Sequence, residues 1–293
     1  MITDDDISAY LDRLDLEREP PSVDALFRLH RAQLEHVPYE TTWIHMGHHY
    51  GTDREESLRR IAHRQTGGYC FQLNGALSLL LQTIGYDVTL HIGGVHGPDG
   101  PIAETMTNHL VLQAHGLPTD ANPDGHWYLD AGLGDALHEP LPLMPGTYQQ
   151  GPFQFGLATI DSPMADWGFQ HHPLGSFSGM AFHTAPTTME SFADRNVYLS
   201  TSTESGFVKL LTVQRRDAGG VDSVRGQVLR RVEDAITSER TLSTRHEWFE
   251  ALADIFELPM KGIAAAELDR LWQRVNATHE AWQAEQAAIE QPN

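Results

Sequence analysis

The sequence predicts an α+β fold with helices at both ends of the chain and antiparallel strands between them. Three observations support this prediction. Apolar residues recur at helical spacing through the first third of the chain, the period changes to two from Val88, and helical spacing returns from Glu247. Gly/Pro turns separate short strand-like pieces up to about residue 190, which is typical of a small antiparallel barrel or sandwich.

The N-terminal helices follow from apolar spacing and capping residues. The first helix comes after an aspartate run that can cap it, and its apolar face comprises Ile7, Tyr10, Leu11 and Leu14. Pro20-Pro21-Ser22 ends this helix and starts another, whose apolar face includes Val23, Phe27 and Leu34. The segment from His36 to Glu40 is expected to be a turn or a short extended piece. A further helix opens at Cys70 and ends near Gly85, with one face formed by Leu73, Leu77, Leu80 and Ile84.

The strands follow from alternation. Val88, Leu90 and Ile92 alternate with Thr89 and His91, which predicts a strand. Further strands are expected over Asn108–His115, Trp127–Ala131 and Phe207–Arg215. The C-terminal helical segment carries apolar residues that are expected to belong to the core: Trp248, Leu252, Ile255, Phe256, Leu268, Leu271, Trp272 and Val275.

Charge and cysteine content exclude several classes of function. The chain of 293 residues has 20 Lys/Arg and 40 Asp/Glu, a net charge of −20, which argues against nucleic acid or an anionic membrane as a partner. Residues 65–194 contain no Lys or Arg, so an anion bound there would need backbone N–H groups, polar side chains or the flanking segments. One cysteine forms no internal disulfide, the acidic N-terminus lacks a signal-peptide pattern, and the apolar run Leu77–Leu81 is too short to span a bilayer. The cytoplasm is therefore the expected compartment.

The single cysteine is the first candidate for chemistry. Cys70 follows the glycine pair Gly67-Gly68 and Tyr69, and it opens an apolar-periodic segment. Unpaired N–H groups at the N-terminus of a helix favour a thiolate, which is the nucleophilic form of cysteine. The alternative is a buried structural thiol, because free cysteines are among the most buried residues.

A thiolate nucleophile needs a base and a group that orients the base. His109 lies in one predicted strand and Asp130 in the next, and residues 118–125 read as a long hairpin loop. With the loop centred between Thr119 and Asp120, the two strands place His109 directly opposite Asp130, with Cβ atoms about 5 Å apart on one face. Leu110, Leu112 and Leu129 then point to the other face. The alternative is an exposed ion pair on a sheet.

Three weaker signals remain. Gly132-Leu133-Gly134 could cradle a phosphate or could be an ordinary turn. His45-x-x-His48-His49 is the tightest group among 17 histidines, but it lacks a neighbouring cysteine or acidic ligand, so a solvated loop is favoured and no metal site is predicted. His171-His172 beside Pro173 also reads as loop.

Together these segments resemble the arylamine N-acetyltransferase family. The family signature R-G-G-x-C-x-E/Q-x-N is matched at Gly67, Gly68, Cys70, Gln72 and Asn74. Residues 107–110 resemble the family's histidine segment, residues 129–134 its D-[VA]-G-F-G segment and residues 37–40 its V-P-F-E-N segment. The resemblance runs through most of the chain and is strongest between about residues 22 and 141, with the segments in the family's order.

The resemblance implies three domains: a helical domain over 1–86 with the cysteine, a β-barrel over 87–195 with the histidine and aspartate, and an α/β lid over 196–293. It implies that Cys70 accepts an acetyl group from acetyl-CoA and passes it to an aromatic amine or hydrazine in a ping-pong reaction, with His109 as base and Asp130 as orienting group. Acetyl-CoA is thus a co-substrate, and no bound cofactor is expected. The implied donor-binding residues are Gly132, Leu133, Gly134 and Thr107; the implied substrate-binding residues are Tyr39, Tyr69 and Leu133.

The chain also departs from the family pattern. Thr66 replaces the signature arginine, Thr41 the asparagine after Glu40, and Leu133 the aromatic residue between the glycines, and the stretch from His109 to Asp130 is long. Two alternatives therefore stay open. One is an amide synthase of the same family that joins a carrier-bound polyketide or another acyl thioester to an aromatic amine. The other is a non-catalytic binding protein on this fold.

Overall fold

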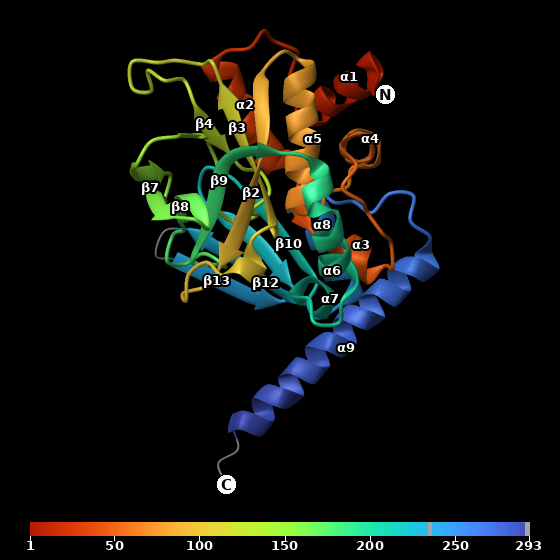
Figure 1. Cartoon of the computed structure of the whole chain (residues 1–293). Helices are drawn as coiled ribbons and strands as arrows, with labels where there is room; N and C mark the ends of the chain where they lie inside the picture. The colour runs from red at the N-terminus through yellow and green to blue at the C-terminus, as the bar shows by residue number, and fades with distance from the viewer. Residues whose placement is uncertain (234–235, 291–293) are drawn as a thin grey trace.

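The computed structural model describes residues 1–233 and 236–290 and confirms the α+β fold class (Figure 1). The N-terminal part consists of helices and one short strand: α1 (Asp4–Arg13), α2 (Val23–His36), β1 (Tyr39–Glu40), α3 (Thr42–His45), α4 (Arg54–Arg64) and α5 (Cys70–Thr83). The cap of α1 is Thr3 and not an aspartate: its hydroxyl accepts from the amide of Asp6, whose carboxylate accepts from the amide of Thr3. Ser22 caps α2, as the break at Pro20-Pro21 suggests.

The middle part is an antiparallel sheet that curls into a nearly closed barrel. Its strands, in spatial order, are β5 (Leu141–Pro142), β4 (Trp127–Leu129), β3 (His109–His115), β2 (Asp87–His96), β9 (Gly179–Thr187), β8 (Ala165–Gln170), β7 (Phe153–Ser162) and β6 (Gly146–Gln150). The short 3-10 helix η1 (Ala103–Thr105) lies between β2 and β3. Helix α5 runs beside β2 and β3 (Figure 1), and its buried leucines share one core with Leu110 and Leu112. This packing places Cys70 near the first residue of β3, His109.

The predicted register of β3 and β4 is wrong by two residues. The strands pair Leu112 with Leu129, and a bridge between Thr119 and Asn122 centres the turn one residue later than expected. Two backbone hydrogen bonds between Thr119 and Asn122 close this tight turn, and they set the register. Continuing this register sets Asp130 opposite Val111, two residues from His109.

The two-residue shift leaves the predicted faces unchanged, because side chains alternate with a period of two. Leu110, Leu112 and Leu129 lie in the core shared with the helices, as expected. Val111 and Tyr128 lie in a separate core inside the barrel. His109 and Asp130 therefore still share a face.

The C-terminal part forms a second antiparallel sheet, with helices around it. Within the described residues the strand order is β1, β10 (Thr212–Arg216), β11 (Val221–Arg225), β12 (Val228–Glu233) and β13 (Ile236–Thr241). The helical elements are η2 (Met189–Phe192), α6 (Ala193–Thr201), α7 (Gly206–Lys209), α8 (Arg245–Asp254) and α9 (Ala265–Glu290). Strand β1 belongs to the N-terminal part by sequence, yet it pairs with β10. The division at residues 86 and 195 stays a prediction.

The prediction of a strand over Phe207–Arg215 is wrong for the first half of this segment. The hydroxyl of Ser205 accepts from the amide of Phe207 and caps α7, so the strand begins only at Thr212. The C-terminal aromatic and aliphatic residues do form a core, which includes Trp248, Leu252, Phe256 and Leu271. The far half of α9 extends away from the rest of the molecule (Figure 1). Among the described residues, no helix combines the length and the apolar character that crossing a bilayer requires.

Candidate active site

Cys70 is the first residue of α5 and lines a cavity. Cys70 is only 4% exposed, and its sulfur lies 3.6 Å from the backbone oxygen of Asn108. The side chain of Gln72 accepts a hydrogen bond from the amide of Tyr69, which fixes the entry of the helix. A cysteine in this position faces the unpaired N–H groups of the first helical turn.

His109 connects the cysteine with a carboxylate. Its Nε2 lies 2.8 Å from Oδ2 of Asp130, and both side chains are buried. Because Nε2 is engaged there, Nδ1 is the ring nitrogen left for Cys70, which lines the same cavity as His109 and influences its pKa. Burial opposes the charged imidazole, but Asp130 and Cys70 outweigh it and raise the pKa of His109 to about 10. The geometry therefore favours an imidazolium beside the sulfur.

Four hydrogen bonds hold the carboxylate of Asp130. Oδ1 accepts from Nδ2 of Asn74 at 2.8 Å and from the amide of Gly132 at 3.0 Å. Oδ2 accepts from His109 and, at 2.9 Å, from the hydroxyl of Tyr128. Burial, and then the Asp130 carboxylate, raise the pKa of Tyr128 well above its usual value, so its hydroxyl stays a donor. A carboxylate with this many partners cannot turn away from the imidazole.

His30 of α2 binds the backbone of Asp130. The amide of Asp130 donates to Nε2 of His30 at 3.1 Å, and Nδ1 of His30 donates to the backbone oxygen of His138 at 3.1 Å. Burial lowers the pKa of His30 to about 4, so the ring is neutral and Nε2 can accept. Neither His30 nor Tyr128 was predicted from the sequence. Period-two spacing from Asp130 could have pointed to Tyr128, whereas no local signal points to His30.

A cavity of about 370 Å³ opens beside Cys70 and His109. Of the predicted binding residues, Tyr39, Gly132 and Leu133 line it. Three predicted residues are not in its lining. Tyr69 is fully buried, and its hydroxyl lies 2.6 Å from Oδ1 of Asn196. The other two are Thr107 and Gly134, whose backbones are left-handed, with φ of 72° and 77°.

The glycine loop at residues 132–134 supports the site structurally. The amide of Gly132 is used to hold Asp130, so it is not free for a phosphate. A Cβ at Gly132 would lie 2.6 Å from Cα of Cys70, so only glycine lets this loop pass so close to α5.

Arg225 of β11 also lines the cavity and was not predicted. Among the described lining residues it alone carries a permanent positive charge. The gap in basic residues over 65–194 was the one hint in the sequence, since it left an anion to be held from a flanking segment.

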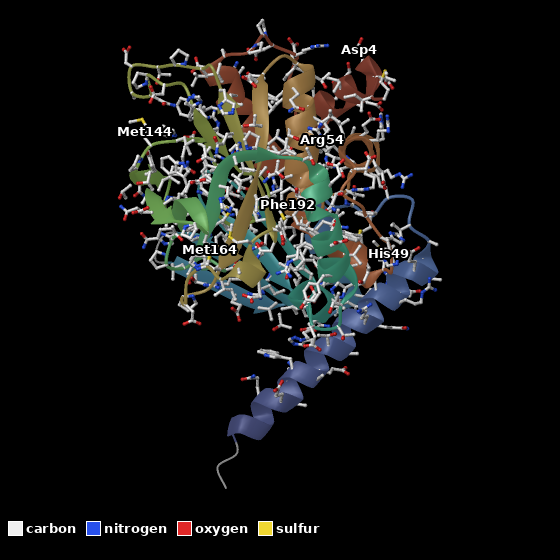
Figure 2. All side chains as sticks on the ribbon, in the orientation of Figure 1. Asp4, His49, Arg54, Met144, Met164 and Phe192 are labelled. Atoms are coloured by element: carbon white, nitrogen blue, oxygen red, sulfur yellow. The ribbon has the colours of Figure 1, made fainter. Side chains whose placement is uncertain are left out.

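The three histidines at residues 45, 48 and 49 do not share a common centre. Nε2 of His45 donates to the backbone oxygen of Phe207, His48 pairs with Glu267 of α9 at 2.8 Å, and His49 lies at the surface (Figure 2). His171 lies in a loop, as predicted, but it is buried, and its Nε2 lies 3.3 Å from Oδ1 of Asp135.

Chemically, this site brings together a thiol, an imidazole and a carboxylate, the groups that nucleophilic catalysis by cysteine uses. A thiolate formed by proton transfer to His109 can attack a carbonyl carbon, and the imidazolium can then return the proton to a leaving group. Such an arrangement can support acyl transfer through a thioester.

Comparison with known proteins points to the same chemistry. A family model described as N-acetyltransferase matches residues 22–265. Arylamine N-acetyltransferase 1 of Homo sapiens is 29% identical over 245 residues, which cover 76% of this chain and 82% of the human protein.

Solved structures agree on the fold. Mycobacterium marinum arylamine N-acetyltransferase in complex with CoA superposes with a TM-score of 0.81 at 23% identity, covering 93% of this chain and 99% of that one. The Nocardia farcinica arylamine N-acetyltransferase gives a TM-score of 0.78 at 25% identity, with 91% and 93% covered.

Proposed function

The chain belongs to the arylamine N-acetyltransferase family and is an acyltransferase, and from this premise we propose that it transfers an acetyl group from acetyl-CoA to an aromatic amine or hydrazine. The observation that carries the proposal is the placement of His109 between Cys70 and Asp130. In the proposed reaction the acetyl group rests on the sulfur of Cys70 between two half-reactions.

In the first half-reaction the thiolate of Cys70 attacks the thioester carbonyl. The bond between the carbonyl carbon and the CoA sulfur breaks, and His109 gives its proton to the departing thiolate. In the second half-reaction the amine attacks the acetyl-cysteine. His109 takes a proton from the amine as the amide forms, and the thiolate of Cys70 leaves and is regenerated with its imidazolium.

Asp130 acts through His109. It holds the ring in one orientation and offsets its charge in both half-reactions, without taking a proton itself. The amides of Cys70 and Phe71 are proposed to stabilise the oxyanion of each tetrahedral intermediate, because they belong to the first turn of α5 beside the sulfur and precede the first hydrogen bonds of the helix.

The cavity lining supports an aromatic acceptor. Leu133, Phe177 and Phe207 line the same cavity as Cys70, and these side chains suit a flat apolar ring. Leu133 is smaller than the aromatic residue that the resemblance leads one to expect here, so it leaves more room beside the sulfur.

The Mycobacterium marinum enzyme was solved in complex with CoA, which supports acetyl-CoA as donor. A larger or carrier-bound acyl thioester is the second candidate. The absence of Lys and Arg between residues 65 and 194 keeps this candidate open, because this part of the chain offers no basic side chain to the phosphates of CoA. Thermal stabilisation by millimolar CoA would support the free donor, and no shift would support the carrier.

We propose the cytoplasm as the compartment and no nucleic-acid or membrane partner. A single cysteine needs no oxidising environment, and a net charge of −20 repels polyanions.

Intact-mass spectrometry after mixing with acetyl-CoA tests the proposal. We expect a mass increase of one acetyl group that maps to Cys70 and disappears when an arylamine is added. An adduct that persists in the amine would contradict the second half-reaction. No adduct with any acyl thioester would leave a non-catalytic binding protein as the better description.

A further inference from the structure

A second cavity of about 310 Å³ lies next to the catalytic cavity. The two share Ser176, Gln214 and Arg225 in their linings, so Arg225 borders both spaces. The second cavity lies between the barrel and the C-terminal sheet, with Asp135 on the barrel side.

One face of the C-terminal sheet forms the wall of this second cavity. Alternate residues of β11 and β12 line it: Val221, Ser223, Arg225, Val228, Arg230 and Val232. Ser223 is paired directly with Arg230, and Arg225 lies two residues along from Ser223. The two arginines are therefore diagonal neighbours on one face, about 7–8 Å apart or somewhat less between Cβ atoms. Two guanidinium groups at this spacing can reach one anionic group.

Neither guanidinium is committed elsewhere. Arg231, on the opposite face of β12, forms ion pairs with Asp217, Asp222 and Glu233. Within the described residues, Arg225 and Arg230 form no ion pair and no side-chain hydrogen bond, and Nε of Arg230 is buried without a partner. A buried donor without an acceptor costs free energy, which an incoming anion would recover.

Two acidic side chains line the same cavity, and among the described residues neither forms an ion pair with Arg225 or Arg230. Asp135 is engaged by His171 and by both the amide and the hydroxyl of Ser176. Glu239 stands opposite Arg230 on β13 but forms no ion pair with it among the described residues. The cavity thus keeps a positive side, in a protein whose net charge is −20.

We propose that Arg225 and Arg230 form a binding site for a negatively charged group of a substrate whose reacting end lies at Cys70. The group is a phosphate on the thioester donor or a carboxylate on the amine acceptor, since both are anions that a guanidinium binds through paired N–H donors. This inference rests on the proposed function. It also accounts for the lack of basic residues between 65 and 194, because the positive charge comes from the C-terminal sheet.

The test measures KM and kcat for Arg225→Gln and Arg230→Gln with matched substrates. Acetyl-CoA is compared with S-acetylpantetheine, which lacks the phosphates, and 4-aminobenzoate is compared with aniline. The expected result is a rise of about tenfold in KM for the anionic member of one pair, as for one charge-assisted hydrogen bond, with kcat and the neutral member little changed.

Three controls sharpen the result. Arg240→Gln removes the same charge from β13, outside the lining of both cavities, and should leave every KM unchanged. Arg225→Lys keeps the charge but loses the paired donors, so its KM should rise less than that of Arg225→Gln, which separates a charge effect from misfolding. In the wild type, KM for the anionic substrate should rise with salt more than KM for its neutral counterpart.

A donor-side change assigns the site to phosphate, and an acceptor-side change assigns it to carboxylate. Unchanged KM values for all four substrates, or equal changes within both pairs, would overturn the inference while leaving acetylation of wild-type Cys70 intact. A wild type that forms no acetyl adduct would instead overturn the proposed function.

Discussion

Nε2 of His109 lies 2.8 Å from Oδ2 of Asp130, although the two residues are not directly opposed on neighbouring strands. The contact runs diagonally across the end of the sheet, where Asp130 follows the last residue of β4. Diagonal neighbours on one face lie within reach of long side chains. The partners of Asp130 at Asn74, Tyr128 and Gly132 then fix the carboxylate in the direction of the ring.

Replacing the nucleophile should abolish turnover. Cys70→Ala and Cys70→Ser should each remove acyl transfer, because alanine has no nucleophile and a serine hydroxyl is far less acidic than a thiol. Thermal denaturation should show that both variants remain folded. Appreciable turnover by folded Cys70→Ala would contradict the covalent mechanism.

Asp130→Asn should fold but react slowly. The amide cannot offset the charge on His109, and its NH₂ group can turn the ring toward the wrong tautomer, so we expect kcat to fall by about 10²–10⁴-fold. Steady-state kinetics with one acceptor at several pH values would measure this. Near-normal rates would mean that Asp130 has no part in orienting His109.

Tyr128→Phe removes one of the four donors to the Asp130 carboxylate and leaves the ring packed in the barrel core. We expect kcat to fall about tenfold or less, and the free energy of unfolding to drop by about 1 kcal/mol. Steady-state kinetics and urea denaturation provide the two values. A kcat loss as large as that of Asp130→Asn would show that Tyr128 does more than hold the carboxylate.

His109 should make the stability of the fold depend on pH in the alkaline range. Its folded pKa of about 10 lies above the ordinary histidine value of 6.5, so the folded state binds the proton more tightly than the unfolded state. The resulting stabilisation is complete below about pH 6.5 and is lost as the pH rises through about 10.

The measurement is the melting temperature of the wild type and of His109→Gln between pH 6 and pH 11. The difference between the two proteins should shrink steadily as the pH rises. A difference that stays constant across this range would contradict the raised pKa.

Gly132→Ala should disturb the site by crowding α5. The new Cβ would meet Cα of Cys70 at 2.6 Å and Cβ of Cys70 at 2.8 Å, so either the loop or the helix must move. We expect loss of most acetylation and a lower melting temperature. Gly97→Ala is the matched control, since a Cβ there meets nothing within 4 Å. Equal behaviour of the two variants would show that the loop does not pack against Cys70 as described.

Local patterns in the sequence were sufficient for much of the fold. The helix that opens at Cys70, the strands that carry His109 and Tyr128, and the core of the C-terminal helices all follow from periodicity, because the faces of helices and strands are set by residues close in sequence. The same alternation placed His109 and Asp130 on one face even though their predicted register was wrong. At residues 206–209 a capping serine overrode the apparent strand pattern.

The sequence by itself determined the nucleophile, the base and the orienting carboxylate as candidates, because each lies in a recognisable local segment. Only the tertiary structure decided what surrounds them. His30 reaches Asp130 from α2, and Arg225 reaches the cavity of Cys70 from β11. These contacts join residues about a hundred or more positions apart, and they depend on how helices, barrel and second sheet pack together, which no local period encodes.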